Sequence, residues 1–226
     1  LAIYALRPQS GLWHRRWLAG NVCDRAAGAV LAAILAAFVV VVPFWEPGNT
    51  GLATENYNVA FWDHESKISF VYEQYGALAH SLLNGRLDLM QDPPEVLLAL
   101  DNPYDSTARE AAQVNSLWDH AYYNGRYYVY FGIVPCLLFQ LPFEAVTGIQ
   151  NLAYPPCMIV MGLLFLLVSF GAVHQVVRRW FSQASSAAYL LSVAAIVLGS
   201  QLYYLFARPY IYEYAIVCGT SLLMLA

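Results

Sequence analysis

The polar stretch 46–126 contains the residues best suited to acid–base chemistry. Glu73 lies there in an aromatic and apolar setting, beside Phe70, Tyr72 and Tyr75. A carboxylate within hydrogen-bond reach of a hydroxyl can remove its proton during group transfer, and such catalysis contributes about 10²–10⁴-fold to the rate. Apolar surroundings raise a carboxyl pKa, which favours action as a base near neutral pH. Glu73 is therefore the first candidate for a catalytic carboxylate, and a solvated loop glutamate is the alternative.

Two Asp-His pairs, Asp63-His64 and Asp119-His120, add further candidates. The second pair could bind an acceptor sugar, stabilise Glu73, or complete a divalent-cation site together with the first pair. Hydrogen bonding to the backbone of a turn is the structural alternative. Asp63 and Asp119 are accordingly the other candidates for the catalytic carboxylate, and a divalent cation is the one cofactor that the sequence suggests.

Several neighbouring side chains are suited to hold a sugar. Tyr75 and Trp118 could stack on sugar faces, although anchoring at the membrane interface explains such aromatic residues equally well. His80 falls on the same helical stripe as Glu73 and would be presented to a cavity or to water. Farther along, Glu213 is close in sequence to Arg208. It could form an ion pair with Arg208 at the membrane edge, or it could belong to the active-site cavity.

These residues belong to a chain that is too apolar for an ordinary soluble domain. Apolar residues make up 59% of it, charged residues 12%, and the mean hydropathy is +0.48, whereas soluble domains carry about 25% charge. The stretch 46–126 holds 12 of the 15 acids and has a net charge of −8. The excess of acid argues against nucleic-acid binding, which needs a basic surface. We expect a multi-span membrane protein with one acidic elaboration.

The first apolar run, residues 26–45, contains no charged side chain. Its length of about twenty residues matches the ~30 Å hydrocarbon core of a bilayer. Arginines precede it at positions 15, 16 and 25. Because positively charged residues remain on the cytoplasmic side, we expect the N-terminus to be cytoplasmic.

Two further apolar stretches follow the polar region. Residues 152–177 form an uninterrupted run that ends at two adjacent arginines, whereas prolines, Gln140 and Glu144 interrupt residues 127–146. If both stretches crossed the membrane, the two arginines would lie outside, against the positive-inside rule. We therefore predict that 127–146 is an interfacial or re-entrant helix on the outer face.

The fold expected from these features is an all-α polytopic membrane protein with about four transmembrane helices and a large outer loop carrying interfacial helices. It would lie in the cell membrane, inner or plasma. The expected segments are a cytoplasmic start at 1–25, spans at 26–45, 152–177 and 185–206, an extracytoplasmic loop at 46–151, a cytoplasmic loop at 178–184, and an outer turn with the start of a fourth span at 207–226. Because the chain starts at a leucine and stops inside an apolar run, we expect the N-terminal part of a larger protein.

Within the loop, local signals predict smaller elements. Apolar spacing favours a helix at 68–83 that is stopped by Asn84-Gly85. Asn124-Gly125 between tyrosine-rich runs is typical of a hairpin turn, and Ser106 is suited to cap a short helix. The four cysteines form no Cys-x-x-Cys pair, so neither a zinc site nor a disulfide framework is indicated, and we expect them to pack in apolar surroundings.

Two segments carry a resemblance to a known family. Residues 73–85 read Glu-Gln-Tyr-Gly-Ala-Leu-Ala-His-Ser-Leu-Leu-Asn-Gly, and residues 119–135 read Asp-His-Ala-Tyr-Tyr-Asn-Gly-Arg-Tyr-Tyr-Val-Tyr-Phe-Gly-Ile-Val-Pro. Together with the topology, they resemble membrane glycosyltransferases of the GT-C fold, in the bacterial branch akin to protein mannosyltransferases and lipid-A aminoarabinose transferases. The resemblance covers residues 15–226 and corresponds to the N-terminal part of such an enzyme.

The resemblance implies transfer of a sugar from a polyprenyl-phosphate donor to a glycan, lipid or protein acceptor of the cell envelope, at the outer membrane face. Glu73 matches the family carboxylate that acts on the acceptor hydroxyl, although many relatives have aspartate there. Arg126 and Arg208 are the candidates for binding the donor phosphate. We expect this segment alone to be inactive. The rival hypothesis is a non-catalytic membrane protein, either a transporter or flippase or a scaffold of envelope assembly.

Overall fold

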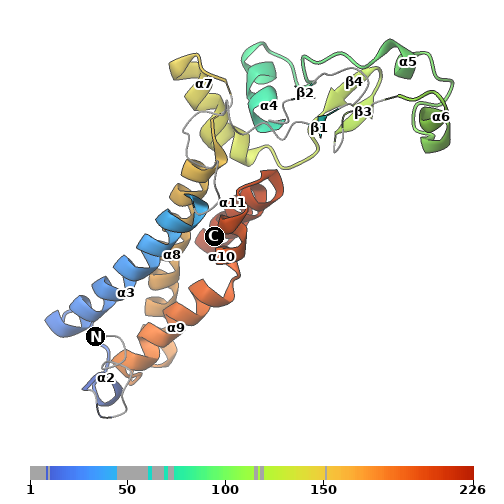
Figure 1. The fold of residues 1–226 in the computed structure, drawn as a ribbon. Coiled ribbons are helices and arrows are strands. Elements are labelled where there is room, and N and C mark those ends of the chain that lie inside the picture. The colour runs from blue at the N-terminus through green and yellow to red at the C-terminus, as the bar shows by residue number, and fades with distance from the viewer. Residues whose placement is uncertain are drawn as a thin grey trace. The chain divides into compact units, whose positions relative to one another are not determined.

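The computed structural model describes residues 9, 11–44, 61–62, 69–70, 74–114, 117, 120–150 and 152–226, which are mostly helical (Figure 1). The chain divides into two compact units. The helical unit comprises Leu1–Thr50 and Tyr154–Ala226, and the loop unit comprises Gly51–Ala153. Each unit has its own internal packing.

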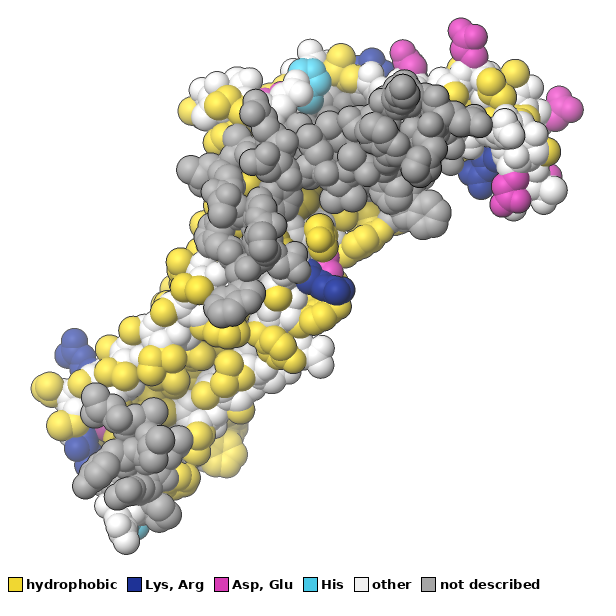
Figure 2. Space-filling model, viewed as in Figure 1, with side chains coloured by type: hydrophobic (Ala, Val, Ile, Leu, Met, Phe, Trp, Pro, Cys, Tyr) yellow, Lys and Arg dark blue, Asp and Glu magenta, His cyan; other side chains and the backbone are white. Residues whose placement is uncertain are grey.

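Helices make up most of the described part of the helical unit. They are α2 (Gly11–His14), α3 (Val22–Val41), the 3-10 helix η1 (Val42–Phe44), α8 (Tyr154–Trp180), α9 (Ser186–Gly199), α10 (Leu202–Ala207) and α11 (Ile211–Leu225). Within the described ranges, α3 and α8 are long and apolar enough to cross a membrane, judged by length and composition. Figure 2 shows hydrophobic side chains over most of the visible face of this unit. Such a surface is typical of contact with lipid rather than water.

Helices α3 and α8 lie side by side and run in opposite directions (Figure 1). Near the start of α3, the buried Asp24 accepts hydrogen bonds from Arg15 Nη2 at 2.9 Å and from Ser186 Oγ at 2.8 Å. Near its other end, Val39 meets Gly162 in the first third of α8. A buried carboxylate needs such partners, and these bonds fasten the chain before α3 to the start of α9. The arginines that flank α3 and those that end α8 therefore lie at the same end of the unit.

The segment expected as a single span at 185–206 is divided into two helices. Helix α9 ends at Gly199, and Gln201 has a left-handed backbone with φ of 57° before α10 begins. A non-glycine residue in this conformation interrupts the helical hydrogen-bond ladder. Hydropathy does not register such a break, because the side chains on both sides of it are apolar.

The loop unit combines short helices with two short antiparallel strand pairs, within a chain whose described residues are mostly helical. Its elements are β1 (Phe61–Trp62), β2 (Ser69–Phe70), α4 (Gln74–Leu83), α5 (Glu95–Leu98), α6 (Ser106–Ala111), β3 (Ala121–Tyr123), β4 (Arg126–Tyr128), the π-helix η2 (Cys136–Gln140) and α7 (Leu141–Thr147). Strands β1 and β2 pair antiparallel, as do β3 and β4. Helix α4 packs against η2 and α7, and these three helices form the centre of the unit.

The predicted hairpin at Asn124-Gly125 is confirmed. Both turn residues have positive φ, 48° for Asn124 and 71° for Gly125, as the turn between two such strands requires. Gly85, with φ of 72°, follows α4 as predicted for a helix end. These glycines succeed as signals because the conformation they adopt is costly for other residues.

Three local predictions are wrong in detail. The helix expected from position 68 begins at Gln74, since Ser69–Phe70 pairs with another strand instead. The cap of α6 is Asp105, whose carboxylate accepts from the Thr107 amide at 2.9 Å, and Ser106 is the first helical residue. The interfacial helix expected over 127–146 starts only at Cys136, because the preceding tyrosines belong to the hairpin or its exit.

Candidate functional site

Four of the predicted site residues, Glu73, Asp63, Asp119 and Trp118, lie outside the described residues, and so does His64. Glu73 nevertheless has a defined place in the sequence, immediately before Gln74, where helix α4 begins. The described part of the site therefore consists of α4 and the elements packed against it.

His80 lies in the last turn of α4 and joins two other parts of the loop unit. Its Nδ1 atom is 2.7 Å from Oε1 of Glu144 on α7 and 2.7 Å from Nε2 of Gln150. Its side chain is 36% exposed, whereas that of Glu144 is 8% exposed. Leu78 and Ala79 of the same helix are buried, so the apolar side of α4 fixes the helix while His80 remains accessible.

Glu144 is a buried acid in a largely apolar setting. Its Oε1 atom contacts His80, and Oε2 has no hydrogen-bond partner in the part of the chain that the structure describes. Burial raises the pKa of the nearby Cys136 thiol to about 12, and the charge of Glu144 adds to this shift. Cys136 is therefore a protonated packing residue at neutral pH. Removing a carboxylate from water is costly unless a partner compensates, and His80 is that partner.

The geometry constrains where the proton of His80 lies. One ring nitrogen cannot donate to Glu144 and accept from Gln150 at the same time. With an ionised Glu144, Nδ1 carries the hydrogen and donates it to the carboxylate oxygen. The other nitrogen, Nε2, makes no hydrogen bond among the described residues and remains available. A carboxylate that holds Nδ1–H in this way prepares Nε2 to accept a proton, or to donate one from the imidazolium form.

Arg126, predicted to bind phosphate, takes part in a charge cluster on Asp88. Its Nη1 atom is 3.3 Å from Asp88 Oδ1, while Arg86 donates to Oδ2 from Nε at 3.2 Å and from Nη2. The hydrogen bonds from Arg86, with a smaller effect of the Arg126 charge, lower the pKa of Asp88. The amide of Leu89 also donates to the carbonyl of Tyr127 at 2.8 Å. The cluster thus fastens the loop after α4 to strand β4, and the Arg126 side chain, 58% exposed, can still attract an anion.

Replacing Asp88 by asparagine is expected to lower the thermal stability of the protein at neutral pH, because the two arginines lose the carboxylate charge and one of its two acceptor oxygens. The lowered pKa means that this stabilisation is present above the ordinary aspartate pKa and is lost as pH falls through the lower folded-state value. Thermal unfolding of the purified protein at pH 7 and at about pH 3 measures the difference. The exposed Asp101→Asn is the matched control. Equal melting temperatures for the Asp88 and Asp101 variants at pH 7 would contradict the structural role.

Arg208, the second predicted phosphate ligand, lies in the helical unit just after α10. Its Nη1 atom donates to Tyr204 Oη at 3.0 Å, and its guanidinium carbon is 5.4 Å from the centre of that ring. Among the described ion pairs there is none between Arg208 and Glu213, so the ion-pair alternative is not realised. Glu213 has a buried Oε2 without a hydrogen-bond partner in the described ranges. A cation at the end of α10 and a poorly compensated acid in the first turn of α11 thus occur close together in sequence.

The other predicted binding residues take part in packing. Tyr75 is 0% exposed, so its ring belongs to the interior of the loop unit and not to a surface on which a sugar could stack. Its carbonyl accepts a weak hydrogen bond from Cys136 Sγ at 3.4 Å. His120 is half-buried, with its ring 6.4 Å from that of Tyr127 in an edge-to-face arrangement.

Sequence reasoning missed Glu144, Gln150 and Asp88 as interacting residues. An acid within an otherwise apolar run was the available signal for Glu144. Among the described residues, no three His, Cys, Asp or Glu side chains gather as metal ligands. In comparisons with known proteins, no family model, curated protein or solved structure matches the chain.

Proposed function

We propose that this chain is part of a GT-C-like membrane glycosyltransferase that moves a sugar from a polyprenyl-phosphate donor to a cell-envelope acceptor. The observation that carries the proposal is the pairing of His80 with the buried Glu144. His80 lies on α4, and Glu73 directly precedes the first residue of that helix in the sequence. A histidine that is held by a buried carboxylate and keeps one ring nitrogen available can remove a proton from a hydroxyl.

The antiparallel arrangement of α3 and α8 supports a location of this chemistry outside the cytoplasm. If both helices cross the membrane, the segment between them leaves and returns on the same side. The flanking arginines lie at the opposite end of the helices and favour the cytoplasm. Helix η2 with α7 covers twelve residues, Cys136–Thr147, or roughly 18 Å, which is too short to cross the ~30 Å core in between.

In this proposal each candidate residue has a separate role in the reaction. Glu73 or His80 removes the proton from the acceptor hydroxyl, and Glu144 holds His80 in the required tautomer. Arg126 supplies positive charge for the departing polyprenyl phosphate, and Arg208 of the helical unit is a separate candidate for the same role. The proposed spans are α3, α8, the broken pair α9–α10, and α11, in a cell membrane with a cytoplasmic N-terminus.

Two observations favour the rival function of a transporter or flippase. The α9–α10 segment is broken at Gln201, and Glu213 near the start of α11 has a buried, uncompensated oxygen. Interrupted helices and acids at membrane depth are features of transport sites. A transporter would move a lipid-linked sugar without breaking its bond to phosphate, which separates the two functions chemically.

Sugar transfer by membranes containing the full-length protein tests the proposal. We expect a polyprenyl-phosphate-linked sugar to be consumed, with free polyprenyl phosphate as product, and we expect a nucleotide-linked sugar to remain intact. Membranes without the protein provide the control. Movement of the intact donor between leaflets without release of polyprenyl phosphate would favour the transporter instead, and the absence of both activities would favour a scaffold.

A further inference from the structure

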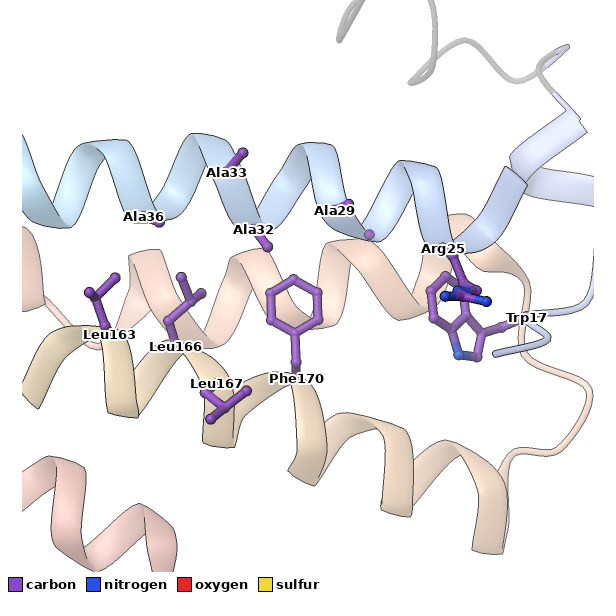
Figure 3. A pocket seen from close by; sticks show the side chains of 11 residues that line it. Trp17, Arg25, Ala29, Ala32, Ala33, Ala36, Leu163, Leu166, Leu167 and Phe170 are labelled. Atoms are coloured by element: carbon purple, nitrogen blue, oxygen red, sulfur yellow. The ribbon is translucent and has the colours of Figure 1, made fainter. Parts of the chain in front are cut away.

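An open groove of about 590 Å³ runs between α3 and α8 in the helical unit (Figure 3). Its floor is formed by alanines that recur on one side of α3, and its wall by larger apolar side chains of α8. These residues are Ala29, Ala32, Ala33, Ala36, Leu163, Leu166, Leu167 and Phe170. Small side chains at this helical spacing keep the floor low along its length. The alanine spacing in the sequence of α3 thus determines the shape of the groove floor.

The groove is apolar along its length and charged at one end only. Arg25 and Trp17 line that end (Figure 3). Arg25 is exposed, and its side chain makes no ion pair or hydrogen bond within the described ranges. Arg15, in contrast, is held by Asp24 at 2.9 Å. The guanidinium that lines the groove thus has no side-chain partner in the described part of the chain.

The dimensions and charge of the groove identify its occupant. From Arg25 to Ala36 the helix rises roughly 16 Å, about half of the ~30 Å hydrocarbon core and hence one leaflet. A tryptophan at the charged end is typical of the headgroup level. The nearby arginines at the end of α8 add positive charge that attracts anionic lipids. A further helix packed in the groove would satisfy its apolar wall but would leave the Arg25 charge uncompensated.

We propose that the groove binds an anionic glycerophospholipid of the leaflet next to the arginine-bearing end, with one acyl chain along the alanines and the phosphate on Arg25. The guanidinium offers paired N–H donors to phosphate oxygens. This lipid is distinct from the proposed sugar donor, which would react at the other end of the helices. The site therefore goes beyond the proposed function and does not depend on it.

Lipid retention measured by native mass spectrometry of the full-length protein in detergent tests the proposal. Phosphatidylglycerol and phosphatidylcholine with identical acyl chains are the probes. We expect the wild type to prefer phosphatidylglycerol, and Arg25→Gln to reduce that preference by about fivefold. Ala32→Phe, which fills the groove, should weaken the binding of both lipids. The matched controls are Arg109→Gln, on α6 of the loop unit, and Val30→Phe, on α3 at a 57% exposed position outside the groove.

Four outcomes would overturn the proposal. An unchanged preference in Arg25→Gln would remove the role of that guanidinium, and equal losses in Val30→Phe and Ala32→Phe would show that the groove has no special part. Stronger retention of a polyprenyl phosphate than of phosphatidylglycerol would assign the groove to the donor. Retention of neither lipid by a protein with wild-type thermal stability would mean that protein fills the groove. Because binding is measured without turnover, these results are independent of whether sugar transfer occurs.

Discussion

Replacing Glu144 by glutamine in the full-length protein is expected to lower the rate of sugar transfer by about 10²-fold or more. The amide keeps the size of the side chain but loses the charge that holds the hydrogen on Nδ1 of His80. In the wild type, that nitrogen is 2.7 Å from Glu144 Oε1. An amide NH₂ can instead donate to Nδ1, which moves the hydrogen to Nε2 and gives the wrong tautomer for a base. The measurement is kcat and KM for transfer as a function of pH.

The exposed Glu110→Gln on α6 is the control for this change, because it removes one charge from the same unit without touching a partner in the described structure. His80→Gln should reduce kcat by a similar factor, and the double variant should be no slower than either single variant, since the two residues act as one unit. Losses that multiply in the double variant would contradict this coupling. A change in KM alone would limit His80 to substrate binding.

Replacing Gly162 by alanine is expected to destabilise the helical unit by about 1–3 kcal/mol. An added Cβ would overlap Cζ of Phe206 on α10 and lie 2.9 Å from Cγ1 of Val39 on α3. Three helices meet there, so the ring cannot move away without opening a second contact. The unfolding midpoint of the purified protein in detergent measures the effect.

Gly171→Ala is the matched control on the same helix, because nothing lies within 4 Å of a Cβ at that position. Alanine is also the better helix former by about 1 kcal/mol, so this variant should be neutral or slightly more stable. Equal destabilisation by the two substitutions would mean that the close approach at Gly162 does not determine stability.

The parts of the fold that were predictable from the sequence depend on strong local physics. A charge-free run long enough to span a bilayer predicted α3, and Asn124-Gly125 predicted the turn between β3 and β4. In both cases few other structures suit the local sequence. The break at Gln201 was not predictable, because left-handed backbone at a non-glycine residue depends on tertiary packing. The same holds for Ser69–Phe70, whose helical spacing is overridden by a strand partner.

The candidate site was predictable only in part, for a related reason. His80 was found through its position on a helical stripe, but Glu144 is sixty-four residues away, and no local pattern links the two. Asp88 carries no local signal of its partners, yet two arginines contact it. Tyr75 was expected at a sugar and is buried instead. Long-range pairing of polar groups is set by the packing of α4 on α7, which composition and spacing do not encode.

The most direct test of the account compares sugar transfer by wild type and Glu73→Gln in membranes with matched amounts of the full-length protein. The account predicts transfer from a polyprenyl-phosphate-linked sugar by the wild type and its loss in the variant, with normal membrane insertion of both. Exposed Glu95→Gln on α5 should behave like the wild type. Unchanged transfer by Glu73→Gln would contradict the assignment of that carboxylate, and no transfer by the wild type with any polyprenyl-linked sugar would contradict the enzyme itself.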